Sequence, residues 1–521
     1  MRLIPAPMAA LHQTQAPTSS SLNASQMRQL PVGGSLAPAR PPTRVMTSKS
    51  KRCVMNPSRR HVLAGLTACA SLPALPRFAQ ASTETNVESA AHRLTLAPAR
   101  QQIAPTDYPA TDLWCVNGTM PGETLRRTQG ARLVVEVDNQ LPQATSLHWH
   151  GIRIDNAMDG VPGVTQDPIQ PGTRFTYDFA LPDAGTYWYH SHAQSVEQVE
   201  RGLQGALIIE EPDAPDVDQD LPLVIDDLRV TAEAAIDANF AVPHDLSHAG
   251  RMGNILLCNG KMVADHPVKT GDRLRLRLIN SANARIFTLG LQGLEGWVMA
   301  YDGMPLATPE ALPDRLLLAP AQRVDLFVDV TAAAGEDAFL VQFERDGGYE
   351  LARFPVASGT RARRPAPSAL PPNPDFPIDL PSARSVDLIT EGGAMAWLSG
   401  ARFKGEDLSG QDLAQLGQFW AFNGSAGRPP EPFVTARLGE TIRIRMVNDT
   451  RFPHAMHLHG MHFSEVRADG SLGPLRDTLL MLQGETREIA FQAHNAGDWL
   501  FHCHMLSHHA AGMGTWVRVT A

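Results

Sequence analysis

Residues 420–428 read WAFNGSAGR, and two earlier segments share this pattern: WCVNGTMPG at 114–122 and LLCNGKMVA at 256–264. Each contains Asn-Gly, a pair that favours a tight turn between strands. After each comes a glycine and then a run in which apolar and polar residues alternate, as in a half-buried strand. These runs are ARLVVEVDN from Ala131, DRLRLRLIN from Asp272 and ETIRIRMVN from Glu440. Three copies of a unit of about 140 residues predict three consecutive β-sandwich domains.

The composition agrees with an all-β protein. Of the 521 residues, 43% are hydrophobic and 19% are charged, which is typical of a globular chain with several cores. The 41 glycines and 41 prolines separate short apolar runs, which indicates strands joined by turns. The formal charge of −9 is spread along the chain without a basic block, and this argues against nucleic-acid binding.

Breaks in the strand pattern give the expected domain boundaries. The segment EPDAPDVDQD interrupts the pattern near residue 213, and a proline-rich stretch at 357–384 is typical of an extended linker. We therefore expect a first domain at 92–212, a second at 213–356 and a third at 385–521.

The first 81 residues are expected to be an unstructured leader and an export signal. Met55 is the expected start, and it is followed by the pair Arg59-Arg60, a modest apolar stretch and an Ala-Gln-Ala site for cleavage after Ala81. This order is typical of a twin-arginine signal peptide. A membrane span needs about 20 unbroken apolar residues, and prolines interrupt this stretch. We expect export by the twin-arginine translocase to the periplasm or the medium, without a membrane span.

Histidine is concentrated in four short windows. The chain has 19 histidines, and ten of them are His148, His150, His190, His192, His454, His457, His459, His502, His504 and His508. All of them except His454 and His508 form four His-x-His pairs. In a strand, residues i and i+2 point to the same face, so each pair directs two imidazoles one way. Two pairs in the first domain and two in the third can meet at an interface and hold about three metal ions.

The last window indicates copper rather than zinc. Cys503 lies between His502 and His504 and faces the opposite side of the strand. With His508, Met513 and His454 it completes a site of two histidines, one cysteine and a weak thioether, which suits blue copper. The first domain lacks this site, because Ser191, Thr145 and Val196 stand where the third domain has Cys503, His454 and His508. The second domain has neither kind of site.

These four windows together resemble the multicopper oxidases, the family of laccases, bilirubin oxidases, ascorbate oxidase and bacterial cuprous oxidases. The resemblance covers nearly all of residues 92–521 and implies three cupredoxin-like domains with four copper ions. By motif position, the type 1 ligands are His454, Cys503, His508 and axial Met513. The type 2 ligands are His148 and His457, and the type 3 ligands are His150, His190, His192, His459, His502 and His504.

The resemblance also implies the reaction. A small-molecule donor gives up single electrons at the type 1 copper, Cys503 transmits them, and dioxygen is reduced to water at the trinuclear cluster. The donor-facing ligand is His508, whose ring edge is expected near the surface. Asp159 matches the acidic residue beside the cluster and is expected to deliver protons. His509 replaces a second acid that often follows the last type 1 histidine, which puts a second proton route in doubt.

Three questions stay open at this stage. Phenolic or aromatic amine donors are favoured, because the chain lacks the methionine-rich insertion of the cuprous oxidases and has Thr450 and Phe452 where they have Asp and Met; a periplasmic cuprous oxidase or copper-resistance protein is the alternative. Cys115 and Cys258 are either a disulfide or two buried thiols. Copper-free relatives of this scaffold bind partners at the division septum, but they lack the ligands that this chain retains.

Overall fold

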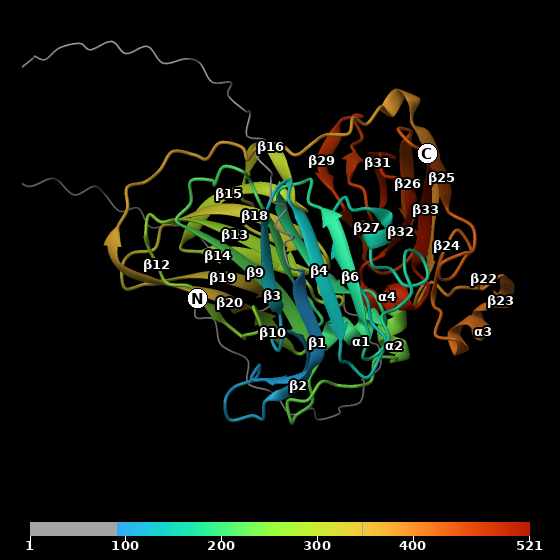
Figure 1. Cartoon of the computed structure of the whole chain (residues 1–521), viewed down its shortest axis with the longest axis horizontal. Helices are drawn as coiled ribbons and strands as arrows, with labels where there is room; N and C mark the ends of the chain where they lie inside the picture. The colour runs from blue at the N-terminus through green and yellow to red at the C-terminus, as the bar shows by residue number, and fades with distance from the viewer. Residues whose placement is uncertain (1–90, 346) are drawn as a thin grey trace, which may run out of the picture. The chain divides into compact units, whose positions relative to one another are not determined.

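The computed structural model describes residues 91–345 and 347–521. The expected leader and twin-arginine signal at 1–81 lie outside the described residues. Strands dominate this part of the chain and the helices within it are short, so the predicted all-β class is confirmed (Figure 1). Within the described ranges, no helix is long and apolar enough to cross a membrane.

The first repeat forms two four-stranded sheets, with orders β2-β1-β4-β6 and β3-β8-β7-β5. A short 3-10 helix (Asn156–Met158) and α1 (Ser195–Glu200) follow β5 and β7. The strands are β1 (His92–Gln101), β2 (Thr111–Val116), β3 (Gly122–Thr128), β4 (Arg132–Asn139), β5 (Leu147–His150), β6 (Arg174–Ala180), β7 (Gly185–Ser191) and β8 (Gln204–Glu210).

The second repeat has sheets of order β10-β9-β13-β18-β15-β16 and β11-β20-β19-β14-β17, with β12 beside β20. Helix α2 (Pro243–Ser247) lies in the connection between β9 and β10. The strands are β9 (Gln219–Leu228), β10 (Ile255–Cys258), β11 (Ala264–Asp265), β12 (Val268–Thr270), β13 (Arg273–Asn280), β14 (Phe287–Gln292), β15 (Leu294–Tyr301), β16 (Met304–Ala311), β17 (Leu316–Leu318), β18 (Arg323–Val330), β19 (Asp337–Glu344) and β20 (Gly347–Thr360).

The third repeat has sheets of order β24-β21-β26-β31-β28-β29 and β25-β33-β32-β27-β30, and a hairpin of β22 and β23. A 3-10 turn (Leu380–Ser382), α3 (Gly410–Gln415) and α4 (Leu506–Ala510) complete it. The strands are β21 (Arg384–Gly392), β22 (Gly400–Phe403), β23 (Glu406–Ser409), β24 (Trp420–Phe422), β25 (Val434–Arg437), β26 (Thr441–Asn448), β27 (His454–Leu458), β28 (Phe463–Val466), β29 (Leu472–Arg476), β30 (Thr478–Met481), β31 (Thr486–Gln492), β32 (Gly497–Cys503) and β33 (Gly514–Thr520).

The Asn-Gly turns show that the three units are copies of one design. Asn117, Asn259 and Asn423 all have positive φ, of 51°, 50° and 47°. In each unit the asparagine side chain hydrogen-bonds the first strand of the unit, which is β1, β9 or β21. It accepts from one backbone N–H of that strand and donates to the carbonyl two residues earlier in it. That strand pairs antiparallel with the strand before the turn and parallel with the alternating run after it. The predicted threefold repeat is confirmed.

Short helices from the three repeats come together beside the histidine windows. Figure 1 shows α1, α2 and α4 near one another, and α4 contacts both of the others. Most buried apolar residues of the first and third repeats belong to one contiguous core, whereas most of those of the second repeat form a separate core. The strands that carry the histidine pairs therefore pack into a shared interior.

We predict that Gly460, which follows His459 directly, tolerates no side chain. It has a φ of +67°, and an added Cβ would overlap the ring of Trp499. Gly470 is a matched control, because its φ of +80° is similar and nothing lies within 4 Å of its added Cβ. Gly470→Ala should cost only the strain of the left-handed backbone, about 1–2 kcal/mol.

Gly460→Ala should cost this strain and the clash with Trp499, so it should lower the melting temperature further and reduce copper uptake. Calorimetry and copper analysis of the two variants measure the difference. Equal melting temperatures would show that the contact with Trp499 does not constrain this turn.

Candidate metal centre

Four strands from two repeats bring eight imidazoles together. In the first repeat β5 and β7 are antiparallel, with His148 opposite His190. In the third repeat β27 and β32 are antiparallel, with His457 opposite His502. The eight rings are at most 8% exposed. Two stacked ring pairs join the repeats, at centroid distances of 3.9 Å for His148–His459 and 3.8 Å for His150–His457.

The ring nitrogens form three overlapping groups of three. Within each group the candidate ligand atoms all lie within 4.8 Å of one another. The groups are His148, His150 and His190; His148, His457 and His459; and His192, His459 and His502. His504 joins them through its Nε2, 3.3 Å from Nε2 of His190.

For many of these rings, one nitrogen has a protein hydrogen-bond partner and the other has none of its own. Nδ1 of His148 lies 2.7 Å from the Asp159 carbonyl, and Nδ1 of His457 lies 2.9 Å from the Asp477 carbonyl. Their Nε2 atoms are buried without a partner. Nε2 of His459 faces Nε2 of His502 at 3.1 Å. A metal site requires this arrangement. The hydrogen bond on the outward nitrogen fixes the ring and its tautomer, and the inward nitrogen is left to bind metal.

The protonation of the rings also fits metal binding. Burial lowers the pKa of the imidazoles listed here, which keeps them neutral and leaves a lone pair on one nitrogen. They are His150, His190, His192, His457, His459, His502 and His504.

Two buried carboxylates support the cluster from outside. Asp159, expected from the sequence, accepts from Nδ1 of His459 at 3.0 Å, and its other oxygen lies 3.3 Å from Nδ1 of His148. Asp477 was not expected. Its Oδ1 lies 3.3 Å from Nε2 of His150. No motif marks Asp477, which precedes β30; its role depends on the pairing of β30 with β27, where Thr478 stands opposite His457.

A second site lies on the other face of β32. Nδ1 of His454, Nδ1 of His508 and Sγ of Cys503 are separated by 3.1, 3.7 and 3.8 Å. The point equidistant from these three atoms lies about 2.1 Å from each, close to the bond lengths of about 2.0–2.3 Å for metal–nitrogen and metal–sulfur ligands. Met513 is fully buried, and its backbone hydrogen-bonds the backbone of both Cys503 and His508.

His508 is placed differently from the sequence expectation. Its ring edge does not lie near the surface: the residue is 0% exposed, and Nε2 donates to the His248 carbonyl at 2.6 Å. Trp420 packs on the ring at a centroid distance of 4.5 Å. The physical reason is that α2 of the second repeat packs on α4, which carries His508. The sequence around His508 does not predict this contact, because the covering peptide belongs to another repeat.

The corresponding place in the first repeat is occupied by an amide. Oε1 of Gln198 accepts hydrogen bonds from Thr145 at 2.7 Å and from Ser191 at 2.5 Å. This polar network fills the positions where the third repeat has His454 and Cys503, in agreement with the expectation that the first repeat has no such site.

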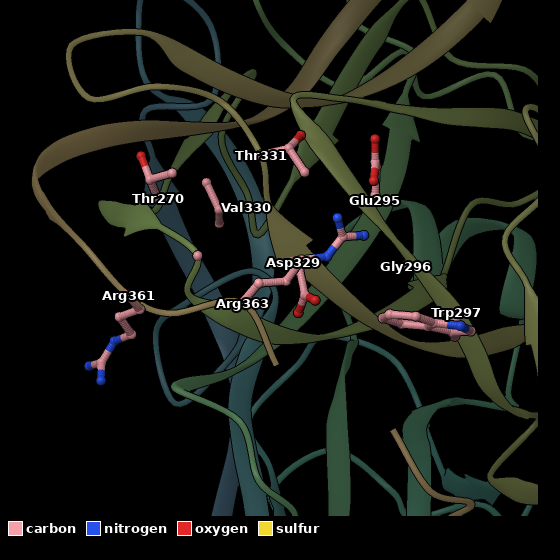
Figure 2. A pocket seen from close by; sticks show the side chains of 10 residues that line it. Thr270, Glu295, Gly296, Trp297, Asp329, Val330, Thr331, Arg361 and Arg363 are labelled. Carbon is pink, nitrogen blue, oxygen red and sulfur yellow. The ribbon is translucent and has the colours of Figure 1, made fainter. Parts of the chain in front are cut away.

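Two features left open in the sequence, the pair Cys115 and Cys258 and the residue His509, have clear places. Cys115 and Cys258 are buried free thiols, and burial raises the pKa of Cys115 to about 11 and that of Cys258 to about 12. His509 lies beside the eight-histidine cluster, with its ring centroid 4.2 Å from that of His502. A cavity of about 320 Å³ in the second repeat is lined by residues such as Glu295, Trp297 and Asp329 (Figure 2) and contains none of the candidate site residues.

Models of the multicopper oxidase family match residues 98–214 and 406–521. The chain is 31% identical over 489 residues to multicopper oxidase MmcO of Mycobacterium tuberculosis, with 86% of this chain and 93% of that protein covered. The chain belongs to the multicopper oxidase family. As a member of it, the protein is a copper-dependent oxidoreductase that uses dioxygen, and its three repeats are cupredoxin-like domains.

Two further similarities extend this result. The crystal structure of Lac15 from a marine microbial metagenome is 43% identical, has a TM-score of 0.68 and covers 82% of this chain and 100% of its own. Copper resistance protein A of Pseudomonas syringae pv. tomato is 26% identical over 547 residues, with 78% of this chain and 88% of that protein covered.

We predict that copper binding at the Cys503 site becomes tighter as pH rises. Burial raises the pKa of Cys503 to about 12 and lowers that of His508 to about 4. Between about pH 5 and 9 the free thiol is therefore protonated and the imidazole is neutral. Copper displaces one proton, so its affinity should rise about tenfold per pH unit.

Chelator competition, followed by the blue absorption, measures this slope, and Cys503→Ser should lack the colour at every pH. An affinity that does not change with pH would mean that the thiol is already ionised.

Proposed function

We propose that the described histidine clusters hold four copper ions, one of type 1, one of type 2 and two of type 3. His454, Cys503 and His508, together with Met513, would hold type 1, and His148 and His457 would hold type 2. The type 3 pair would be held by His150, His190, His192, His459, His502 and His504. The observation that carries the proposal is made on buried rings such as those of His148 and His457: one ring nitrogen hydrogen-bonds a carbonyl, and the other points into the cluster without a hydrogen-bond partner.

Bound copper supplies the one-electron redox chemistry that couples oxidation of a donor to reduction of dioxygen to water. The chain's contribution is to hold the two sites on opposite faces of one strand. Cys503 is covalently joined to His502 and His504, so the link between the sites is short and fixed. Burial of all three side chains, each at most 1% exposed, keeps bulk water from this link.

Asp159 is the proposed proton donor for dioxygen reduction. It is fully buried, and its carboxylate lies within 3.0–3.3 Å of ring nitrogens of His459 and His148. This position lets one group fix the rings and deliver a proton into the cluster.

Asp159→Asn tests this role, because the amide oxygen still accepts from Nδ1 of His459 but the group no longer carries a proton. We expect oxygen uptake to fall by about 10²–10⁴-fold, the usual size of a general-acid contribution. Anaerobic bleaching of the blue colour by the donor should keep its rate. Asp155→Asn, an exposed neighbour, is the control, and oxygen uptake by Asp159→Asn at the control rate would rule out the proton role.

We propose phenols or aromatic amines as the donors. Thr450 and Phe452 lie beside the type 1 site: Oγ1 of Thr450 is 2.8 Å from Nε2 of His454, and Phe452 packs between Trp420 and His248 at centroid distances of 5.9 and 5.5 Å. This aromatic surrounding suits a planar organic donor better than a metal ion.

Oxidation of cuprous ion in copper resistance is the second candidate, and one observation favours it. Met252 is 38% exposed and Met395 is 68% exposed. Arg229 binds both the Met252 carbonyl and Asp245 of α2, the helix that packs beside His508. The backbone of Ala394, next to Met395, donates to the Ser247 carbonyl of α2. Thioether sulfur is a preferred ligand of cuprous ion.

Oxygen uptake by the mature, copper-loaded protein decides between the donors. A simple phenol and cuprous ion are supplied side by side, with Met252→Leu and Met395→Leu measured in parallel. Faster uptake with the phenol, unchanged in both variants, is the expected result. Faster uptake with cuprous ion that falls in the methionine variants would contradict the organic donor.

We also propose export of the folded, copper-loaded enzyme by the twin-arginine translocase to the periplasm or the medium. The support is the Arg59-Arg60 pair ahead of an apolar stretch and a cleavage site after Ala81. A copper enzyme gains from this route, because metal can be inserted before export.

A further inference from the structure

The second domain has none of the proposed copper ligands, yet one of its arginines reaches the trinuclear site. Arg323, the first residue of β18, is 1% exposed. Its two terminal nitrogens bond the two oxygens of Asp477, at 2.8 and 2.6 Å, in a fork-like pair. Its Nε donates to the Thr186 carbonyl at 3.1 Å, in the first domain. One guanidinium therefore joins all three domains.

Asp477 stands between two proposed ligands of different copper types. Its Oδ1 lies 3.3 Å from Nε2 of His150, a proposed type 3 ligand. Its carbonyl lies 2.9 Å from Nδ1 of His457, a proposed type 2 ligand, and its Oδ1 lies 3.4 Å from the same nitrogen. The unpartnered nitrogens, Nδ1 of His150 and Nε2 of His457, are left for metal. The position of Asp477 therefore determines the orientation of both rings.

A buried carboxylate needs compensation to remain charged and in place. Arg323 provides it, and it holds the pKa of Asp477 well below the usual range despite burial. Asp302 fixes the arginine in turn: its Oδ1 accepts from the backbone N–H of Arg323 at 2.9 Å, and its Oδ2 accepts from that of Thr478 at 3.3 Å. Asp302 thus fixes both Arg323, which binds the Asp477 carboxylate, and Thr478, which follows Asp477 in the chain.

The histidine motif itself makes room for the arginine. Gly151 follows His150 directly and has a φ of +86°. A Cβ at this position would overlap Nη2 of Arg323 and come within 2.7 Å of Oδ2 of Asp477. The glycine that ends His-Trp-His-Gly therefore leaves space for Arg323 of the second domain and Asp477 of the third.

We infer that Arg323 is a positioning residue of the trinuclear site: it holds Asp477, and Asp477 orients His150 and His457 toward copper. The inference rests on the proposed ligand set. It assigns to the second domain a part in dioxygen reduction, without any ligand of its own.

Arg323→Lys tests the inference, because lysine keeps the positive charge and loses the two-pronged contact. Arg275→Lys is the matched control. Arg275 also comes from a strand of the second domain, is fully buried and binds a carboxylate, Glu211, through two bonds of 2.9 Å. Neither Glu211 nor Asp325, its other partner, is a proposed ligand.

The electron paramagnetic resonance signal of type 2 copper and its retention against a chelator are the measurements. In Arg323→Lys we expect the type 2 signal to change and its copper to be lost about 10–100-fold more readily, the usual effect of removing support from a ligand. The blue type 1 colour should remain, which also shows that the protein is folded. Arg275→Lys should match the wild type in all three respects.

A type 2 signal in Arg323→Lys equal to that of the wild type, or the same change in Arg275→Lys, would overturn the inference. A wild-type protein that is blue but has no type 2 signal would instead contradict the proposed ligand set.

A double variant shows whether Arg323 acts through Asp477. If it does, Arg323→Lys added to Asp477→Asn should cause little further loss of type 2 copper beyond Asp477→Asn alone. Losses that simply multiply would mean that the two residues act independently and would overturn the inference.

Discussion

The structure depends on holding eight imidazoles against one another in a buried space. In a buried space each ring nitrogen needs a defined partner. The outward nitrogens find carbonyls and carboxylates, as His148 and His459 do with Asp159. The inward nitrogens only face each other. Such an arrangement persists only because the strands are fixed by the common core of the first and third domains.

This constraint explains how the three copies of one unit have diverged. The third domain retains a site on each face of β32. The first has only its pair of His-x-His strands, and Gln198 satisfies the hydroxyl groups of Thr145 and Ser191, which stand where the third domain has His454 and Cys503. The second has neither site and acts as a support: Arg323 reaches the proposed trinuclear site, and His248 covers the proposed type 1 site. A domain without ligands thus contacts both proposed centres.

The sequence predicts those features that depend on local periodicity. A His-x-His pair in a strand points two rings one way, and the intervening Cys503 points the other way, so the faces of β32 follow from the pattern alone. The Asn-Gly turns also locate the three repeats, because the tight turn depends only on these two neighbouring residues. The contacts of Asp477 with His150 and of His248 with His508 were not predictable, because they join residues 327 and 260 positions apart in the chain. Nothing near them in the sequence marks such a contact.

The peptide that covers His508 also affects the proposed type 1 site. Because Nε2 donates to the His248 carbonyl, the proton of the neutral ring is fixed on Nε2 and the lone pair is fixed on Nδ1, toward Cys503. Thr450 does the same for His454 through its Nε2. Both rings therefore present the lone pair of Nδ1 to a metal before it binds. The same bond places a peptide of the second domain over Nε2 of His508, and the residue is fully buried. The second domain thereby fixes the tautomer of a proposed ligand and covers its ring.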